Sequence, residues 1–221
     1  MEHKIAIVQV YDDAIKAYAE YSRLINSLYC VKQGYTYLCW EYDLVPAQIS
    51  VYYNKIQAIF NAMNSDKNFE WILYLDSDAC VANHDIRIEE LIERQQDKEI
   101  IFARDINGSN NGVFLIKNTE KMKEYLQKCF SDRRFYHTNF PEQNAMFAIA
   151  LSDEYKDLVG WEEAMFFNAY YPLYKDFKQV DKYFNEDSFI LHMARLPAKF
   201  RAEKFRILLS KFNINCFTKG E

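Results

Sequence analysis

Two acidic residues, Asp76 and Asp78, stand directly after a short apolar run, Trp71 to Leu75. Such a run, rich in aromatic and β-branched residues, predicts a buried strand, and open α/β sheets bind ligands where their strands end. If the chain stays extended, both carboxylates lie on one face, about 6 to 7 Å apart, and could bind one hard cation. The two acids could equally cap the following segment, and the D-x-D spacing alone leaves both interpretations open.

The composition is that of a globular protein with a sizeable core. The chain has 221 residues, half of them hydrophobic, with 17 Tyr and 17 Phe but only five Gly and four Pro. This length favours one domain, with a main unit over residues 1–194 and a basic amphipathic tail over 195–221 that belongs to it. The formal net charge of −5 argues against a nucleic-acid partner, because such binding needs Lys and Arg to neutralise phosphates.

The cysteines and the apolar runs bear on the cellular compartment. Cys30, Cys39, Cys80, Cys129 and Cys216 contain no C-x-x-C pair and are odd in number, so neither a disulfide framework nor a zinc site is predicted. No apolar run reaches about 18 residues, and the N-terminus lacks the apolar core of a signal peptide. We therefore expect a cytoplasmic protein.

Apolar strands alternate with helical patterns through the first two-thirds of the chain. This alternation predicts an α/β fold whose sheet is covered by helices on both faces. We expect strands near residues 5–10, 35–40, 71–75, 100–103, 113–117 and 188–192, and helices near 14–28, 50–63, 86–94, 120–130 and 145–150. The opening lacks both G-x-G-x-x-G and the P-loop pattern, so a nucleotide must be held by other means.

Four separated stretches together resemble one family. They are residues 71–79, 110–118, 142–145 and 189–192. In order and spacing they resemble the metal-dependent glycosyltransferases of the GT-A fold, most closely the retaining galactosyl/xylosyl/mannosyltransferase family of xyloglucan xylosyltransferases and galactomannan galactosyltransferases. The resemblance covers residues 5–195 and implies a mostly parallel, Rossmann-like central sheet flanked by helices.

The resemblance also implies an activity. Such an enzyme moves a hexose or pentose from a nucleotide-diphosphate sugar to a hydroxyl of a glycan or glycolipid. The implied cofactor is Mn²⁺ or Mg²⁺, and the implied outcome is retention of configuration. A UDP-sugar is the favoured donor, with GDP-mannose as the alternative.

By the same resemblance, three residues form the metal site. Asp78 is the main ligand, Asp76 is shared between the metal and the ribose, and His192 completes the set. A divalent cation held in this way would bridge both phosphates and stabilise the leaving group. Read alone, His192 is a core histidine, and His84, which lies closer to the acid pair, is the rival ligand.

Further residues resemble those around the donor. Asn111 and Gly112 resemble the family's strand-entry motif, which serves the sugar hydroxyls, although Asn-Gly is also the commonest turn signal. Asp105 resembles an acid that holds the transferred sugar. Lys55 resembles a helix-borne base that reaches the donor pocket, whereas without the resemblance it reads as a solvated helix lysine.

Glu142 and Gln143 match the family's acid–Gln pair near the anomeric carbon. If a covalent glycosyl-enzyme forms, Glu142 is the nucleophile; if the acceptor attacks from the leaving-group face, Gln143 supports an oxocarbenium-like transition state. Pro141 and Glu142 also fit an ordinary helix start.

The chain departs from the family after His192. Many relatives continue there with Phe, a small residue and Gly, but this chain has Met193, Ala194 and Arg195. Positive charge for the diphosphate would then come from Arg195 or Lys199.

The tail combines basic residues with a helical apolar pattern. Between residues 195 and 211, six basic residues stand against one acid, Glu203, and apolar residues recur every three to five positions. Residues 195–212 could therefore lie on the cytoplasmic membrane surface, or form a C-terminal helix that packs on the sheet, and both interpretations stay open.

Two other functions compete with glycosyl transfer. A haloacid-dehalogenase-like phosphohydrolase also places D-x-D after an apolar strand, but its usual Thr is Cys80 here, and no later G-D-x-x-x-D follows. A non-catalytic module on the same sheet would bind a sugar nucleotide or glycan without turnover.

Overall fold

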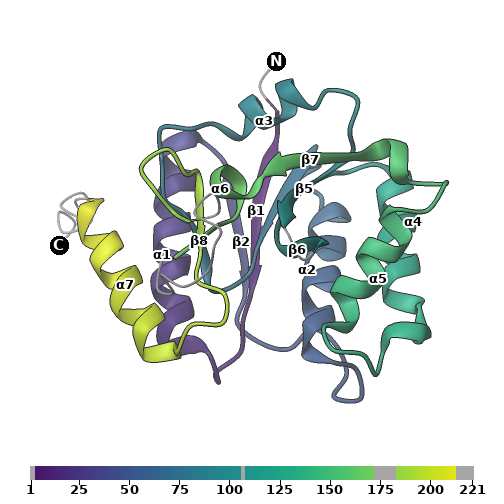
Figure 1. Cartoon of the computed structure of the whole chain (residues 1–221), viewed down its shortest axis with the longest axis horizontal. Helices are drawn as coiled ribbons and strands as arrows, with labels where there is room; N and C mark the ends of the chain where they lie inside the picture. The colour runs from purple at the N-terminus through teal and green to yellow at the C-terminus, as the bar shows by residue number, and fades with distance from the viewer. Residues whose placement is uncertain (1–2, 106–107, 172–182, 213–221) are drawn as a thin grey trace.

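The computed structural model describes residues 3–105, 108–171 and 183–212, which form a sheet with helices on both faces (Figure 1). All six residues of β1 (Ile5–Val10) and all five of β3 (Trp71–Leu75) are buried. Strands buried on both faces read as continuous apolar runs, so these two are the plainest in the sequence. The other strands are β2 (Thr36–Trp40), β4 (Ala79–Val81), β5 (Ile100–Asp105), β6 (Gly108–Lys117), β7 (Val159–Glu163), β8 (Ala169–Tyr170) and β9 (Ile190–His192).

The central sheet has six strands in the order β2-β1-β3-β6-β5-β7. β1 runs parallel to β2 and to β3, and β5 runs parallel to β7. β6 is antiparallel to both of its neighbours, β3 and β5, so the sheet is mixed. Since three of the five strand pairs are parallel, the expected α/β fold with a mostly parallel sheet is confirmed.

A second, three-stranded sheet has the order β4-β9-β8. β4 follows the D-x-D motif and has only three residues, too few for a periodic pattern to appear in the sequence. β9 is antiparallel to β4, and the register pairs Ala79 with His192. This pairing brings a residue from near the end of the chain beside the residue that follows Asp78.

The helices cover both faces of the central sheet (Figure 1). α2, α4 and α5 pack on one face, whereas α1 and α3 cover the other. Thr119 caps α4 by accepting a hydrogen bond from the Met122 backbone N–H, as expected. The helices are α1 (Lys16–Gln33), α2 (Asn54–Met63), α3 (Ile88–Arg94), α4 (Glu120–Ser131), α5 (Pro141–Ala150), α6 (Ala164–Phe167) and α7 (Ala198–Lys211), with 3-10 turns η1 (Val51–Tyr53), η2 (Arg133–Phe135) and η3 (Lys156–Leu158).

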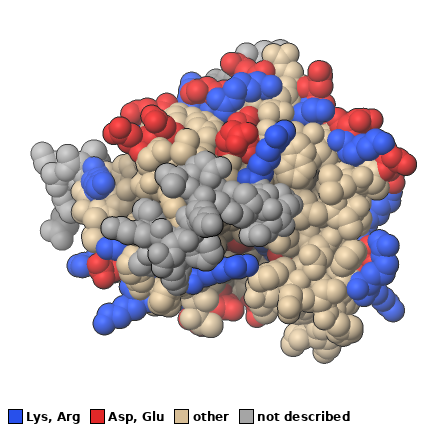
Figure 2. Space-filling view, in the orientation of Figure 1, with Lys and Arg blue, Asp and Glu red and all other residues tan. Residues whose placement is uncertain are grey.

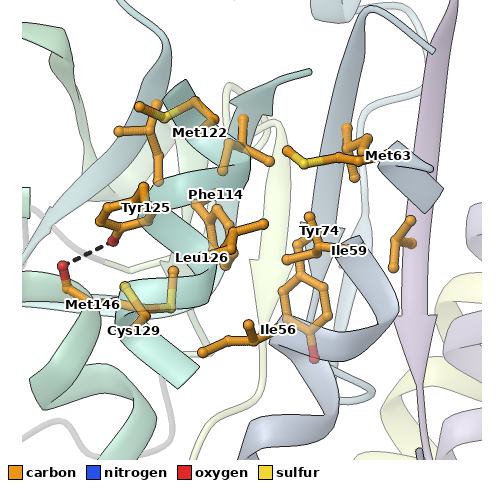
Figure 3. Close-up of a cluster of buried hydrophobic side chains, with 14 of the residues drawn as sticks. Ile56, Ile59, Met63, Tyr74, Phe114, Met122, Tyr125, Leu126, Cys129 and Met146 are labelled. Carbon is orange, nitrogen blue, oxygen red and sulfur yellow. Dashed lines mark hydrogen bonds between the residues drawn. The ribbon is translucent and has the colours of Figure 1, made fainter. Parts of the chain in front are cut away.

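Figure 3 shows the core between α2, α4 and the sheet. Helical residues three or four positions apart share one face, and those of α2 and α4 that face the sheet are almost fully buried. The buried Tyr125 hydroxyl donates a hydrogen bond to the Met146 carbonyl at 2.8 Å, which ties α4 to α5. This core fixes α2 and α5, the helices that carry Lys55 and Glu142.

The basic tail forms α7, which packs against α1 (Figure 1). Phe205 and Leu209 are buried in this contact, with exposed fractions of 0% and 6%. The tail is thus a packed helix, although it packs on α1 and not on the central sheet. A membrane contact through residues 195–212 stays a prediction, and Ile207 of α7 is 45% exposed. Among the described residues, no helix has both the length and the apolar character needed to cross a bilayer.

Charges of both signs are interspersed on the face shown in Figure 2. The Lys and Arg side chains coloured there lie among Asp and Glu side chains.

Candidate active site

The chain turns sharply at the end of β3. The Ala79 N–H donates to the Asp76 carbonyl at 2.8 Å and closes a tight turn over residues 76–79. Residues 76–78 therefore do not continue the extended strand, and this turn, not the pleat of a strand, directs the two acids. The Asp76 N–H donates to the Gly112 carbonyl at 2.6 Å, which anchors the turn to β6.

A buried polar cluster holds the turn from beneath. Gln9, Ser22 and Asn26 are each at most 1% exposed. Gln9 Nε2 donates to the Asp76 carbonyl at 3.0 Å, while Ser22 Oγ and Asn26 Nδ2 donate to the Ala79 carbonyl at 2.6 and 3.2 Å. Leaving a buried carbonyl unpaired is costly, so these bonds specify the turn. The sequence analysis missed the cluster, although Gln9 within the apolar run IAIVQV is a signal for it.

Asp76, Asp78 and His192 converge beside this turn. One ligand atom from each lies within 4.8 Å of the others, and within the described part of the chain this is the group of three that could hold a metal ion. Ligands about 2.1 Å from a small divalent cation lie at most about 4.2 Å apart, so a small inward movement of the side chains suffices. Two carboxylates and one imidazole fit such a cation and leave coordination positions for phosphate oxygens and water.

His192 is held by a neighbour that the sequence analysis missed. Its Nδ1 lies 2.8 Å from Asn168 Oδ1, and its Nε2 lies 3.1 Å from Asp78 Oδ1. When a metal binds, donation of the Nδ1 proton to Asn168 would leave the Nε2 lone pair free for the cation. Asn168 is 1% exposed and belongs to no motif that could be recognised in the sequence.

Gly112, which has no side chain, leaves the space in which the candidate metal ligands meet. A Cβ atom at this position would lie 2.4 Å from His192 Cε1 and 2.7 Å from Asp76 Oδ2. Both distances are shorter than any tolerated contact, so glycine is required here for close approach rather than for a turn.

Arg201 supplies positive charge to Asp78 from α7. Its Nη2 lies 3.1 Å from Asp78 Oδ2, and its guanidinium lies over the Tyr18 ring at 4.8 Å. Burial by itself would raise the pKa of Asp78, but His192 and Arg201 together hold that pKa below its usual value. Asp78 is therefore ionised and ready to bind a cation.

Lys55 is buried between two carboxylates. Its Nζ lies 3.2 Å from Asp76 Oδ1 and 3.2 Å from Glu142 Oε1, and it also donates to the Asn111 side-chain oxygen at 3.1 Å. The solvated-lysine interpretation is wrong, since Lys55 is 4% exposed. Burial alone would lower its pKa, but Asp76 and Glu142 raise the pKa above the usual value, so Lys55 stays charged.

Glu142 and Gln143 open α5, with Pro141 in its first turn. Glu142 is 3% exposed, and its Oε2 has no hydrogen-bond partner within the described structure. Starting a helix does not require the acid to be buried, and an unpaired buried carboxylate oxygen is costly, so the helix start alone does not explain Glu142. Gln143 Oε1 accepts a hydrogen bond from the Asn111 backbone N–H at 3.3 Å, so the acid–Gln pair and the Asn-Gly motif lie together.

These groups line one cavity of about 530 Å³. This volume is typical of a site for a small ligand. Of the residues predicted for the site, the cavity brings together Lys55, Asp76, Asp78, Asn111, Glu142, Gln143, His192 and Arg195.

The sequence also predicts Lys199 and Asp105 for the site. Lys199 is exposed and does not line the cavity, whereas Arg201, two positions further along α7, does. Arg201, Phe205 and Leu209 are four residues apart, so they share the inward face of the helix, and this spacing could have identified Arg201. The side chain of Asp105 lies outside the described residues.

His84, the rival metal ligand, lies away from the cavity. Its ring stacks on Phe212 at 3.9 Å, and it does not line the cavity of the acid pair. Burial lowers its pKa to about 4, and the nearby Lys32 adds to this, so His84 is neutral at physiological pH.

The sequence comparison points to one family. Residues 25–96 match the galactosyl transferase GMA12/MNN10 family, and this stretch contains the D-x-D turn. A comparison with curated proteins gives no match.

Solved structures of glycosyltransferases share the fold. A glycosyltransferase involved in the glycosylation of the major capsid of PBCV-1 has a TM-score of 0.73 at 16% identity, covering 92% of this chain and 99% of that chain. The galactosyltransferase LgtC, in complex with donor and acceptor sugar analogs, has a TM-score of 0.56 at 15% identity, covering 93% and 95%. The bifunctional WbbM has a TM-score of 0.59 at 10% identity, covering 95% of this chain and 50% of that chain.

Both comparisons confirm the resemblance to glycosyltransferases. The family match covers the part of the chain with the candidate metal ligands Asp76 and Asp78, and the structural matches extend over nearly all of the chain. The GT-A fold that the sequence predicts is thereby confirmed, and the haloacid-dehalogenase interpretation has no support in the fold.

Proposed function

We propose that this chain, with its GT-A fold and its match to the galactosyl transferase GMA12/MNN10 family, transfers a hexose or pentose from a nucleotide-diphosphate sugar to a glycan or glycolipid hydroxyl. The donor is a UDP-sugar in the first instance, with GDP-mannose as the alternative. LgtC, with the same fold, has been solved with donor and acceptor sugar analogs, which supports a two-substrate site here. The cytoplasmic location stays a prediction.

One observation carries this proposal. The three candidate metal ligands and the Lys55–Glu142 pair meet in one cavity, although they come from four different segments of the chain. If these ion pairs served only to stabilise the fold, the neighbouring Gly112 would not need to lack a side chain. The cluster is therefore built for a ligand and not for stability.

The metal end of the cavity suits a diphosphate. Asp76, Asp78 and His192 would hold Mn²⁺ or Mg²⁺, which neutralises the phosphate charge as the leaving group departs. Arg201, together with Arg195 at the cavity wall, supplies fixed positive charge to the same oxygens.

The other end suits the transferred sugar. Asn111 and Gln143 offer amide groups to sugar hydroxyls, and Lys55 holds Asp76 and Glu142 at fixed positions. Retention of configuration is proposed on the family resemblance, with Glu142 as the nucleophile or Gln143 as the group that supports an oxocarbenium-like transition state.

A ligand panel tests the proposal. Thermal unfolding is measured with UDP- and GDP-sugars, each with and without Mn²⁺. A donor that binds only the folded chain adds about 2.7 kcal/mol of stability at 100 times its Kd. We expect one nucleotide class to stabilise the protein only with metal, and nucleoside diphosphate to be released from that donor. Binding without release would identify the non-catalytic module, and no binding by any donor would refute the proposal.

A further inference from the structure

Two aromatic side chains, Tyr52 and Phe140, stand half exposed at the edge of the active-site cavity. Their exposed fractions are 49% and 46%, and their ring centroids lie 6.4 Å apart with the planes at 53°. Both residues line the cavity, Tyr52 from η1 and Phe140 from the residue before α5. Large aromatic side chains open to solvent beside a binding cavity are a feature that core packing does not explain.

Two groups of contacts can be distinguished among the residues that line this cavity. Arg201 lies over the Tyr18 ring and pairs with Asp78, beside the other candidate metal ligands. Phe140 stands two residues before Glu142, and its ring contacts Tyr52. The aromatic pair is therefore connected to the acid–Gln pair through the start of α5.

Phe140 has a strained backbone. Its φ of 56° and ψ of 60° lie in the left-handed region, where a bulky residue is an outlier. Glycine or asparagine would adopt this conformation at lower cost. Backbone strain that presents a ring to solvent beside a binding cavity indicates that the ring has a function there.

We infer that Tyr52 and Phe140 form a platform on which a sugar ring of the acceptor glycan stacks. This inference rests on the proposed function, because an acceptor is required for glycosyl transfer. The C–H face of a pyranose is apolar and packs on an aromatic ring, while its hydroxyl groups stay in water or reach polar neighbours. An acceptor must reach the acid–Gln pair from solvent, and the two half-exposed rings line the same cavity, with Phe140 two residues before Glu142.

Variants that remove each ring provide the test. Phe140→Asn removes the ring and suits the left-handed backbone, so its midpoint of thermal unfolding is expected to stay the same or rise. Tyr52→Ala removes the partner ring. Leu151→Asn is the matched control, because Leu151 is 59% exposed and does not line the cavity.

Binding is measured separately for saccharide and nucleotide. Cellobiose, lactose and maltose are the saccharide probes in saturation-transfer-difference NMR with Mg²⁺, and UDP and GDP binding with Mg²⁺ is measured by calorimetry on the same samples. We expect at least one disaccharide to bind the unaltered chain, and each ring variant to weaken that binding about tenfold, equivalent to about 1.4 kcal/mol. Leu151→Asn should bind like the unaltered chain.

Three results would contradict the inferred platform. The first is that no disaccharide binds the unaltered chain, and the second is that disaccharide binding survives in both ring variants. The third is a loss of nucleotide affinity as large as the loss of saccharide affinity, which would identify the rings as a base-stacking site. The calorimetry with UDP and GDP tests the proposed function separately. If neither nucleotide binds the unaltered chain, glycosyl transfer is refuted, whether or not a saccharide binds.

Discussion

Arg201 Nη2 lies 3.1 Å from Asp78 Oδ2, so the C-terminal helix reaches the metal-binding turn. The Arg201 Nε also donates to the Met193 carbonyl at 3.0 Å, which fixes the guanidinium against β9. A cation on Asp78 and a guanidinium on the same carboxylate compete for its charge, while a bound diphosphate would attract both. Arg201, from the tail of this chain, thus lines the candidate active site.

Arg201→Met should separate metal binding from donor binding. Without the competing guanidinium, we expect Mn²⁺ alone to bind equally well or more tightly, whereas donor affinity falls about tenfold because charge on the diphosphate is lost. Calorimetry with Mn²⁺ and then with nucleoside diphosphate measures both. Lys199→Met, on the exposed side of the same helix, is the control, and an equal loss of donor affinity there would contradict the assignment.

Gly112→Ala should damage the metal site directly. The added methyl group would meet His192 and Asp76 at less than 3 Å, and both must move. We expect a loss of about 1–3 kcal/mol in the free energy of unfolding and at least a tenfold loss of Mn²⁺ affinity. Gly34→Ala is the matched control, because Gly34 has a φ of 78° but no atom near its Cβ position. That variant should lose stability and keep its metal affinity.

Lys55→Met should be strongly destabilising. The substitution leaves Asp76 and Glu142 close together without the Lys55 ammonium group between them. Breaking a buried ion pair of this kind costs about 3–5 kcal/mol. Urea unfolding measures the change, and adding Glu142→Gln should restore part of the stability because one buried charge is removed. The exposed Lys67→Met should stay within about 0.5 kcal/mol of the unaltered chain. A similar small effect at Lys55 would show that the pair is not coupled.

His84 predicts a dependence of stability on pH. Burial lowers its pKa from 6.5 to about 4, so between these values the unfolded chain binds a proton that the folded chain does not. The contribution of the neutral His84 to the free energy of unfolding is complete at neutral pH. About 2 kcal/mol of it is lost as the pH falls from 6.5 to about 4. His84→Phe, which keeps the stacking on Phe212, should remove this part of the slope. Urea unfolding at both ends of the range measures it, and parallel curves for the two proteins would refute it.

Part of the candidate site could be predicted because its acid pair stands at the end of an element, and the rest was predicted through the family resemblance. Asp76 follows the apolar run of β3, and α/β sheets bind ligands where such strands end, whereas His192 ends β9 of the second sheet and was predicted as a ligand only through the family resemblance. Lys55 and Glu142 were predicted through the family resemblance alone. On periodicity alone, Lys55 would be a surface lysine, and only the tertiary structure shows it buried between two carboxylates.

The remaining features depend on contacts between distant segments. The turn over residues 76–79 is set by Gln9, Ser22 and Asn26, which lie more than 50 residues away along the chain. β4 is too short to show a pattern, and its pairing with β9 joins segments more than 100 residues apart. No local propensity specifies such a pairing. Arg201 had a signal in its spacing from Phe205 and Leu209, but a helical lysine at position 199 was the nearer candidate.

The central claim is that a cation held by Asp78 drives donor cleavage. The most direct test is the release of nucleoside diphosphate from the donor selected by the ligand panel, with Mn²⁺ and with chelator, for the unaltered chain and for Asp78→Asn. Asparagine keeps the size of the side chain but removes its charge, so the fold should persist while the cation loses its main ligand. We predict that release requires Mn²⁺ and falls at least 100-fold in Asp78→Asn, a loss of about 2.7 kcal/mol of transition-state stabilisation. Full release by Asp78→Asn, or by the unaltered chain in chelator, would contradict the account.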